Sequence, residues 1–274
     1  MMVEALVYFF VPALVGVLIG IASGLLGIGG GTVMVPIFRL AFGMSATMST
    51  ATSLFAIIPT SISGAISHVK GKTCIPALGI AAGLGGACLS PVGVWLAQLS
   101  PDWLVMLAAA LIIGYSAINM FKKAFKVPRA GQPAEGADAA APTADDSSLS
   151  RKQLLQGAAI GLVAGLASGY VGVGGGFIMV PLMLSIIGIP MRKASGTSLI
   201  AVMILAIPGV IEQGIIGNIN YLAGIAIVIG TIPGAVIGAR LVTKVPERTL
   251  RLLFGCFLIV AAVMLVLNEV GVLG

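Results

Sequence analysis

The sequence predicts an all-α membrane protein that crosses the bilayer many times. Its 274 residues are 58% hydrophobic and only 9% charged, and the mean hydropathy is +1.13. Apolar runs of about 20 residues, long enough to cross a bilayer core, recur along almost the whole chain. A soluble domain would need more polar residues to coat it. A transmembrane β-barrel would need short alternating segments, which the sequence lacks.

The distribution of charge fits a membrane protein rather than a nucleic-acid-binding one. Most of the 15 Lys and Arg residues lie between the apolar runs or flank one polar segment, which is the positive-inside pattern. The three cysteines show no paired spacing, so neither a disulfide framework nor a metal site is expected. No cofactor is expected either. The sequence shows no nucleophile–base pair, and we therefore do not expect an enzyme.

Two copies of one pattern make up the chain, each with five hydrophobic segments. The first copy places them at residues 5–26, 32–42, 46–66, 74–99 and 103–121. The second places them at residues 154–171, 177–187, 194–211, 221–242 and 250–270. Residue 168 corresponds to residue 23, and this offset of 145 aligns the two halves without a gap. A match of this length indicates a duplication.

Three domains follow from this pattern. Residues 1–121 form the first transmembrane repeat, 122–152 a linker rich in Ala, Pro and Asp, and 153–274 the second repeat. The composition of the linker predicts a flexible segment, and its basic flanks predict that it is cytoplasmic. Loops that are basic in one half lack Lys and Arg in the other. The halves are therefore predicted to lie in the membrane in opposite senses, with both termini outside.

A run of glycines precedes the second segment of each half. The runs read Gly27-Ile-Gly-Gly-Gly31 and Gly172-Val-Gly-Gly-Gly176, and Met-Val-Pro follows each. Glycine runs release the backbone from regular helix. The segments that follow are short. The first two segments of each half are either two full crossings or a re-entrant hairpin, because both arrangements return the chain to the same side of the membrane. Inverted repeats with broken helices are typical of secondary transporters, whose site lies near the midplane between the copies.

The glycine runs are the predicted binding site for an anion. Irregular backbone inside a bilayer persists only where it is buried in protein or lines a water-filled cavity. A helix start with bare N–H groups attracts anions. The alternative is that the glycines only allow close packing of helices. The glycines assigned to substrate binding are Gly29, Gly30, Gly31, Gly174, Gly175 and Gly176.

Several polar residues complete the candidate site. The hydroxyls of Thr52, Ser53, Thr197 and Ser198, at matched positions in the two halves, bond either the anion or their own helix carbonyls. Arg39 either balances the charge of the substrate or extends to the membrane interface. A role in gating or coupling is assigned to His68, Gln213 and Glu212.

These motifs resemble the sulfite exporter TauE/SafE family. The resemblance rests on the paired glycine runs with Met-Val-Pro, and on the Ser/Thr-rich segment that ends Ile66-Ser-His68-Val-Lys70-Gly71. It covers both halves and excludes the linker. It implies a multi-pass permease of the bacterial inner membrane for sulfite, sulfoacetate or other organosulfonates. An anion channel on the same scaffold and a permease for carboxylate anions remain alternatives. The expected partners are a small anion and the lipid bilayer, with no nucleic acid.

Overall fold

A computed structural model describes the backbone of residues 2–125 and 150–269, and the side chains of residues 12–125 and 150–267. All regular structure in this part of the chain is helical. The first half contains α1 (Met2–Leu26), α2 (Gly31–Phe42), α3 (Ala46–Lys70), α4 (Pro76–Leu99) and α5 (Asp102–Phe125). The second half contains α6 (Arg151–Val171), α7 (Gly176–Leu182), η1 (Met183–Ile187), α8 (Met191–Ile216), α9 (Tyr221–Leu241) and α10 (Glu247–Glu269).

The helices confirm an all-α polytopic membrane protein. Seven of those described are long and apolar enough to cross a membrane, and the part of α1 with described side chains, α2 and α7 with η1 are shorter apolar helices. The segment boundaries agree with the prediction to within a few residues, except that α3, α5, α6 and α8 extend further into polar flanks. Helix α6 begins early because Ser150 and Gln153 form a capping box.

Both ends of the predicted linker, residues 122–152, are helical in the structure. Residues 122–125 belong to α5 and residues 151–152 belong to α6. The rest of the predicted linker, apart from Ser150, lies outside the described residues.

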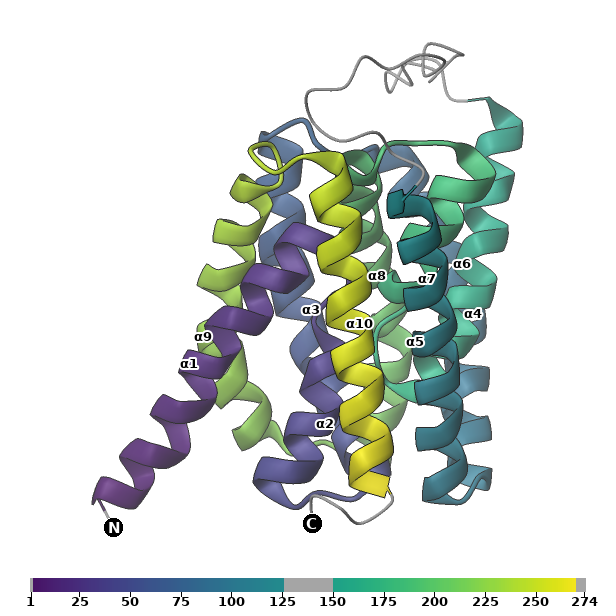
Figure 1. Cartoon of the computed structure of the whole chain (residues 1–274). Helices are drawn as coiled ribbons and strands as arrows, with labels where there is room; N and C mark the ends of the chain where they lie inside the picture. The colour runs from purple at the N-terminus through teal and green to yellow at the C-terminus, as the bar shows by residue number, and fades with distance from the viewer. Residues whose placement is uncertain (1, 126–149, 270–274) are drawn as a thin grey trace.

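The chain reverses direction at the first glycine run. In Figure 1, α1 starts at the lower end of the molecule, and α2 returns to that end, where α3 begins. Helix α2 has 12 residues, which corresponds to about 18 Å, or little more than half of a hydrocarbon core of about 30 Å. Helices α1 and α2 thus form a helical hairpin, and α2 by itself is too short to cross the hydrocarbon core upright.

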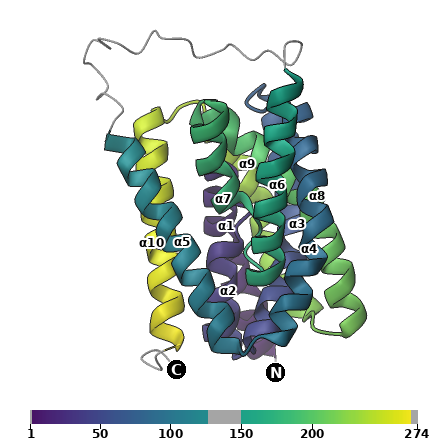
Figure 2. The ribbon, with the colours of Figure 1, turned by 90° about the vertical axis from the view of Figure 1, so that its right-hand side faces the viewer.

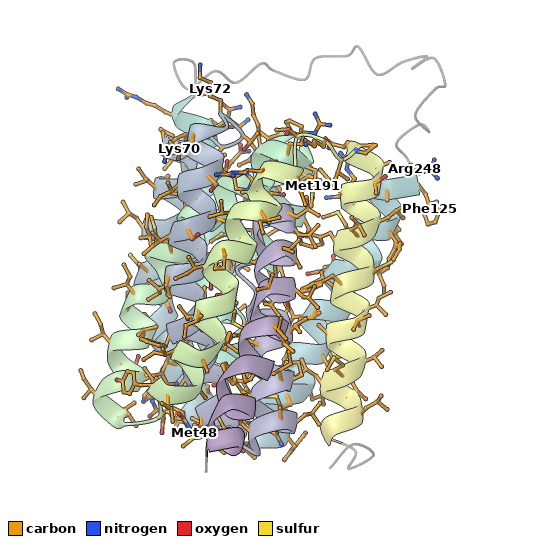
Figure 3. All side chains as sticks on the ribbon, turned by 90° about the vertical axis from the view of Figure 1, so that its left-hand side faces the viewer. Met48, Lys70, Lys72, Phe125, Met191 and Arg248 are labelled. Atoms are coloured by element: carbon orange, nitrogen blue, oxygen red, sulfur yellow. The ribbon has the colours of Figure 1, made fainter. Side chains whose placement is uncertain are left out.

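The second half is arranged in the opposite direction. Helix α6 starts at the upper end in Figure 1, and Met191, the first residue of α8, lies at that end in Figure 3. Lys70, Lys72, Phe125 and Arg248 lie at the same end, whereas Met48 lies at the other.

Helices in equivalent positions pack in equivalent ways. Helix α1 packs along α9 and α6 along α4, while α3 and α8 cross between these pairs. Helices α5 and α10 pair with each other, as Figure 2 shows on one side of the bundle. Small residues bring the backbones close: a Cβ atom at Gly161 would meet the carbonyl of Ala82, and one at Gly230 the carbonyl of Ala13.

Carboxylates hold the starts of the two central helices. Asp102 accepts a hydrogen bond from the backbone N–H of Ala46, with 3.2 Å between N and Oδ2. Glu247 accepts one from the backbone N–H of Met191, with 2.8 Å between N and Oε1. Both carboxylates suit the positive end of the helix dipole. The two pairs are related by the 145-residue offset, so each half fixes its central helix in the same way.

Candidate functional site

The two glycine runs interrupt their helices with backbone that side chains disfavour. Gly29 and Gly30 have φ angles of 82° and 84°, and Gly174 has a φ of 73°. Only glycine adopts this left-handed region without strain. The runs differ at Gly175, which has a φ of −17°. No side chain caps the start of α2 or of α7.

The two breaks lie directly against each other. A Cβ atom at Gly31 would clash with the carbonyl oxygen of Val173, and one at Gly176 with the carbonyl oxygen of Gly27. Gly31 and Gly176 are equivalent in the two halves, so the contact is reciprocal. Every residue of both breaks is buried. The structure thus brings the two predicted groups of glycines together between the hairpins.

Two branched side chains from the central helices cover this junction. Ile57 of α3 lies against Gly29, Gly31 and Gly174, and Val202 of α8 lies against Gly29 and Gly174. Both side chains are fully buried. The junction of the breaks is therefore buried in the bundle under these two side chains.

Thr52 and Thr197 contact loops rather than the breaks. The hydroxyl of Thr52 accepts a hydrogen bond from the backbone N–H of Asn220, at 3.0 Å. The hydroxyl of Thr197 accepts one from the backbone N–H of Ile75, at 2.9 Å. Each threonine thus fixes the residue that precedes α9 or α4. This arrangement supports packing between the halves.

The two serines of the predicted site differ from each other. Ser198 donates a hydrogen bond to the carbonyl of Gly27, at 2.7 Å, and so joins α8 to the first break. Ser53 is also fully buried, but its hydroxyl has no hydrogen-bond partner among the described residues. The offset makes these two serines equivalent, although only one of them contacts a glycine carbonyl.

Arg39 lies away from the junction. It is half-buried in the last turn of α2, eight residues after Gly31. Eight residues correspond to about 12 Å along a helix. The structure therefore places Arg39 toward the lower end of the bundle and does not bring it together with the glycines.

His68 and Gln213 occupy equivalent positions at the ends of α3 and α8. His68 is fully buried, with Nε2 2.7 Å from the carbonyl oxygen of Gly24 and Nδ1 2.7 Å from the hydroxyl of Thr73. Gln213 accepts a hydrogen bond from the Asn218 side chain, at 2.8 Å. Both residues thus fix the turn after their helix. Within the described residues, neither side chain forms a hydrogen bond with the glycine breaks.

Glu212 is half-buried beside Gln213. Its Oε2 atom is buried without a hydrogen-bond partner among the described residues. This carboxylate lies near the C-terminal end of α8, close to the loop that joins α8 to α9, as its position in the sequence predicted.

The sequence reasoning missed three buried hydroxyls at the first break. Ser23, Thr32 and Ser61 are fully buried, and their oxygens have no hydrogen-bond partner in the described part of the chain. A comparison of the halves could have found two of them, because Thr32 corresponds to Phe177 and Ser61 to Ala206.

Two grooves lie on the flanks of the bundle, away from the breaks. One of about 820 Å³ lies between α3 and α9 and includes Lys70 and Arg240. The other, of about 730 Å³, lies between α5, α6 and the α7–η1 segment and includes Lys123. The Lys123 ammonium donates to the carbonyl of Pro181, at 2.7 Å. No glycine of either break lines these grooves.

Long apolar helices, with two broken-helix hairpins whose breaks meet inside the bundle, define a polytopic helical membrane protein of the kind that builds transporters. A match to the sulfite exporter TauE/SafE family covers residues 12–265. The chain belongs to this family.

The chain is similar to several bacterial membrane transporters over nearly its whole length. It is 26% identical to the probable membrane transporter protein YunE of Bacillus subtilis, over 94% of this chain and 97% of that protein. It is 28% identical to YdhB of the same organism, over 87% and 92%. A probable membrane transporter protein of Haemophilus influenzae is 29% identical, over 91% and 95%. No solved structure matches the chain.

These similarities identify the chain as a multi-pass membrane protein of a transporter family. Within the described residues, no three His, Cys, Asp or Glu side chains come together as metal ligands would.

Proposed function

We propose that the protein is a secondary carrier of small sulfur-containing anions, such as sulfite, sulfoacetate or other organosulfonates. The observation that carries the proposal is the meeting of the two helix breaks inside the bundle, Gly31 against Val173 and Gly176 against Gly27. Broken helices that meet between two halves of opposite direction are the arrangement in which carriers bind their substrates.

The chemistry of the breaks suits an anion. The start of α2 directs backbone N–H groups and the positive end of the helix dipole toward the junction. No acidic side chain is among the atoms nearest to the glycines. The family name supports sulfite as one substrate, and hydrogen-bond donors of this kind suit the oxygen atoms of sulfite and of sulfonates alike.

The closed junction favours a carrier over a channel. Both breaks are buried, and Ile57 and Val202 cover them from opposite helices. A channel in its conducting state would hold an open path past the site. Alternating access instead requires that the α1–α2 and α6–α7 hairpins move relative to α3 and α8, so that the junction opens to one side at a time.

The orientation in the membrane is part of the proposal. The end of the bundle that carries Lys70, Lys72 and Arg248 faces the cytoplasm of the bacterial cell, because basic residues are retained on that side. Both termini are then outside, across the inner membrane.

Counterflow in proteoliposomes tests the carrier directly. Vesicles that contain the purified protein are loaded with unlabelled sulfite and diluted into a trace of ³⁵S-labelled sulfite. A carrier accumulates label transiently above the level in vesicles loaded with buffer alone, because exchange is faster than net flow. Equal uptake in both vesicle types would favour a channel. Repeating the loading with acetate tests the carboxylate alternative.

A further inference from the structure

Unpartnered hydroxyls are unevenly distributed in the core. Buried polar groups in proteins are hydrogen-bonded in the great majority of cases, and each exception calls for a reason. Among the described residues, seven fully buried Ser and Thr hydroxyls have no partner: Ser23, Thr32, Ser49, Ser53, Ser61, Ser90 and Ser168.

Three of these residues belong to the first break or lie beside it. The Ser61 oxygen lies 3.5 Å from the position that a Cβ atom at Gly29 would take. The Cβ atom of Ser23 lies 3.6 Å from the corresponding position at Gly30. Thr32 is the second residue of α2. Three different helices, α1, α2 and α3, thus contribute one of these residues each at or beside the first break, and the Ser61 oxygen itself lies beside Gly29.

Backbone donors are free at the same place. The N–H groups of Gly31 and Thr32, in the first turn of the 12-residue helix α2, have no acceptor among the described residues. At the second break the N–H of Gly176 donates to the carbonyl of Gly174, while the N–H of Phe177, like that of Thr32, has no acceptor among the described residues.

The hydroxyl cluster is not repeated in the second half. Ser23 corresponds to Ser168, but Thr32 corresponds to Phe177 and Ser61 to Ala206. At Gly175 the nearest atoms belong to Ala164 and Leu205. The surroundings of Gly174 and Gly175 are thus mainly apolar, whereas Thr50 lies against Gly172 at the start of the second run.

No charged side chain adjoins the cluster. The side chains nearest to Gly29 and Gly30, besides the two serines, are those of Ile19, Met34, Ile57 and Val202. The cost of moving an ion from water into a low-dielectric site rises with the square of its charge. Neutral donors without a counter-charge therefore select an anion with a single charge.

We propose that the first break alone holds the oxyanion group of the substrate, with the hydroxyls of Ser23, Thr32 and Ser61 and the N–H groups of α2, and that it prefers a group with one charge, such as a sulfonate or hydrogen sulfite, to one with two charges, such as sulfate. This inference rests on the proposed function. The second break supplies an apolar wall, and the site is asymmetric although the fold is repeated.

Binding of methanesulfonate to the full-length protein in detergent, measured by calorimetry, tests the proposal. Ser61→Ala, Thr32→Val and Ser23→Ala should each weaken binding about tenfold or more, because a hydrogen bond to an anion is lost. Ser168→Ala is the matched control, since it removes the equivalent hydroxyl from the second half, and it should bind as the wild type does. Thermal unfolding should be little changed in all four variants, since none of these hydroxyls has a protein partner. If Ser61→Ala does not fold, Ser61→Cys replaces it.

The outcomes separate this inference from the proposed function. If the wild type binds none of methanesulfonate, sulfite and acetate, the proposed function fails. Two results with a wild type that binds would refute the asymmetric site but leave the proposed carrier function intact. One is that Ser168→Ala weakens binding as much as Ser23→Ala does. The other is that the first-break variants bind normally. Sulfate, which carries two charges on a similar array of oxygens, should bind at least about tenfold more weakly than methanesulfonate. Equal or tighter binding of sulfate would overturn the charge preference.

Discussion

Replacement of Thr197 by Val separates a packing role from a substrate-binding role. Valine keeps the shape of threonine but removes the hydroxyl that accepts the backbone N–H of Ile75 at 2.9 Å. Ile75 is only 2% exposed, so water cannot readily replace the lost acceptor. A buried N–H left without a partner costs about 1–3 kcal/mol. We therefore expect Thr197→Val to lower the free energy of unfolding by about that amount.

The equivalent change in the other half, Thr52→Val, is a reference against which the loss of stability of Thr197→Val can be compared. Thr52→Val removes the acceptor for the N–H of Asn220, which is half-buried and can bond to water instead. Its cost should be smaller, about 0.5–1.5 kcal/mol. The assay is thermal or denaturant unfolding of both variants in detergent, together with methanesulfonate binding by the folded protein. Unchanged stability of Thr197→Val with lost binding would refute the packing role.

Two further substitutions test the packing that surrounds the site. Gly31→Ala should abolish folding or transport because its Cβ would clash with the carbonyl of Val173. The control Gly114→Ala has open space around it and should fold and transport as the wild type does. Equal behaviour of the two variants in expression and transport assays would contradict the close contact of the breaks. His68→Leu should lower the free energy of unfolding by about 1–3 kcal/mol, since the carbonyl of Gly24 loses its partner and the hydroxyl of Thr73 keeps only the backbone carbonyl of residue 68. His68→Gln, which introduces the residue found at the equivalent position of the second half, should lower the free energy of unfolding less than His68→Leu does. Thermal unfolding that shows a larger loss for His68→Gln than for His68→Leu would contradict this role of His68.

The sequence predicted the helices well because their signals are local. Long apolar runs, glycine breaks and a constant offset between the halves define the segments without knowledge of any contact. The polar flanks of the helices were less well predicted: α5 continues to Phe125, and α6 starts at Arg151 after the cap at Ser150. Caps and last turns depend on a few residues, so hydropathy does not locate them.

The contacts of the candidate site depended on tertiary structure. The recurrence of Thr52 and Thr197 left open whether their hydroxyls bond an anion or a helix carbonyl, and only the fold shows that each accepts a hydrogen bond from a loop N–H. Ser61 was overlooked because the reasoning looked for residues that repeat between the halves, and Ser61 is a position at which they differ.

Location of a bound anion tests the central claim most directly. Selenite is a heavier analogue of sulfite, and its selenium can be located in crystals of the full-length protein by anomalous scattering. The account predicts a selenium peak within the bundle, beside Gly30, Gly31 and Thr32 and opposite Ile57. Peaks confined to the flank grooves near Lys70 or Lys123, with none at the junction of the breaks, would contradict it.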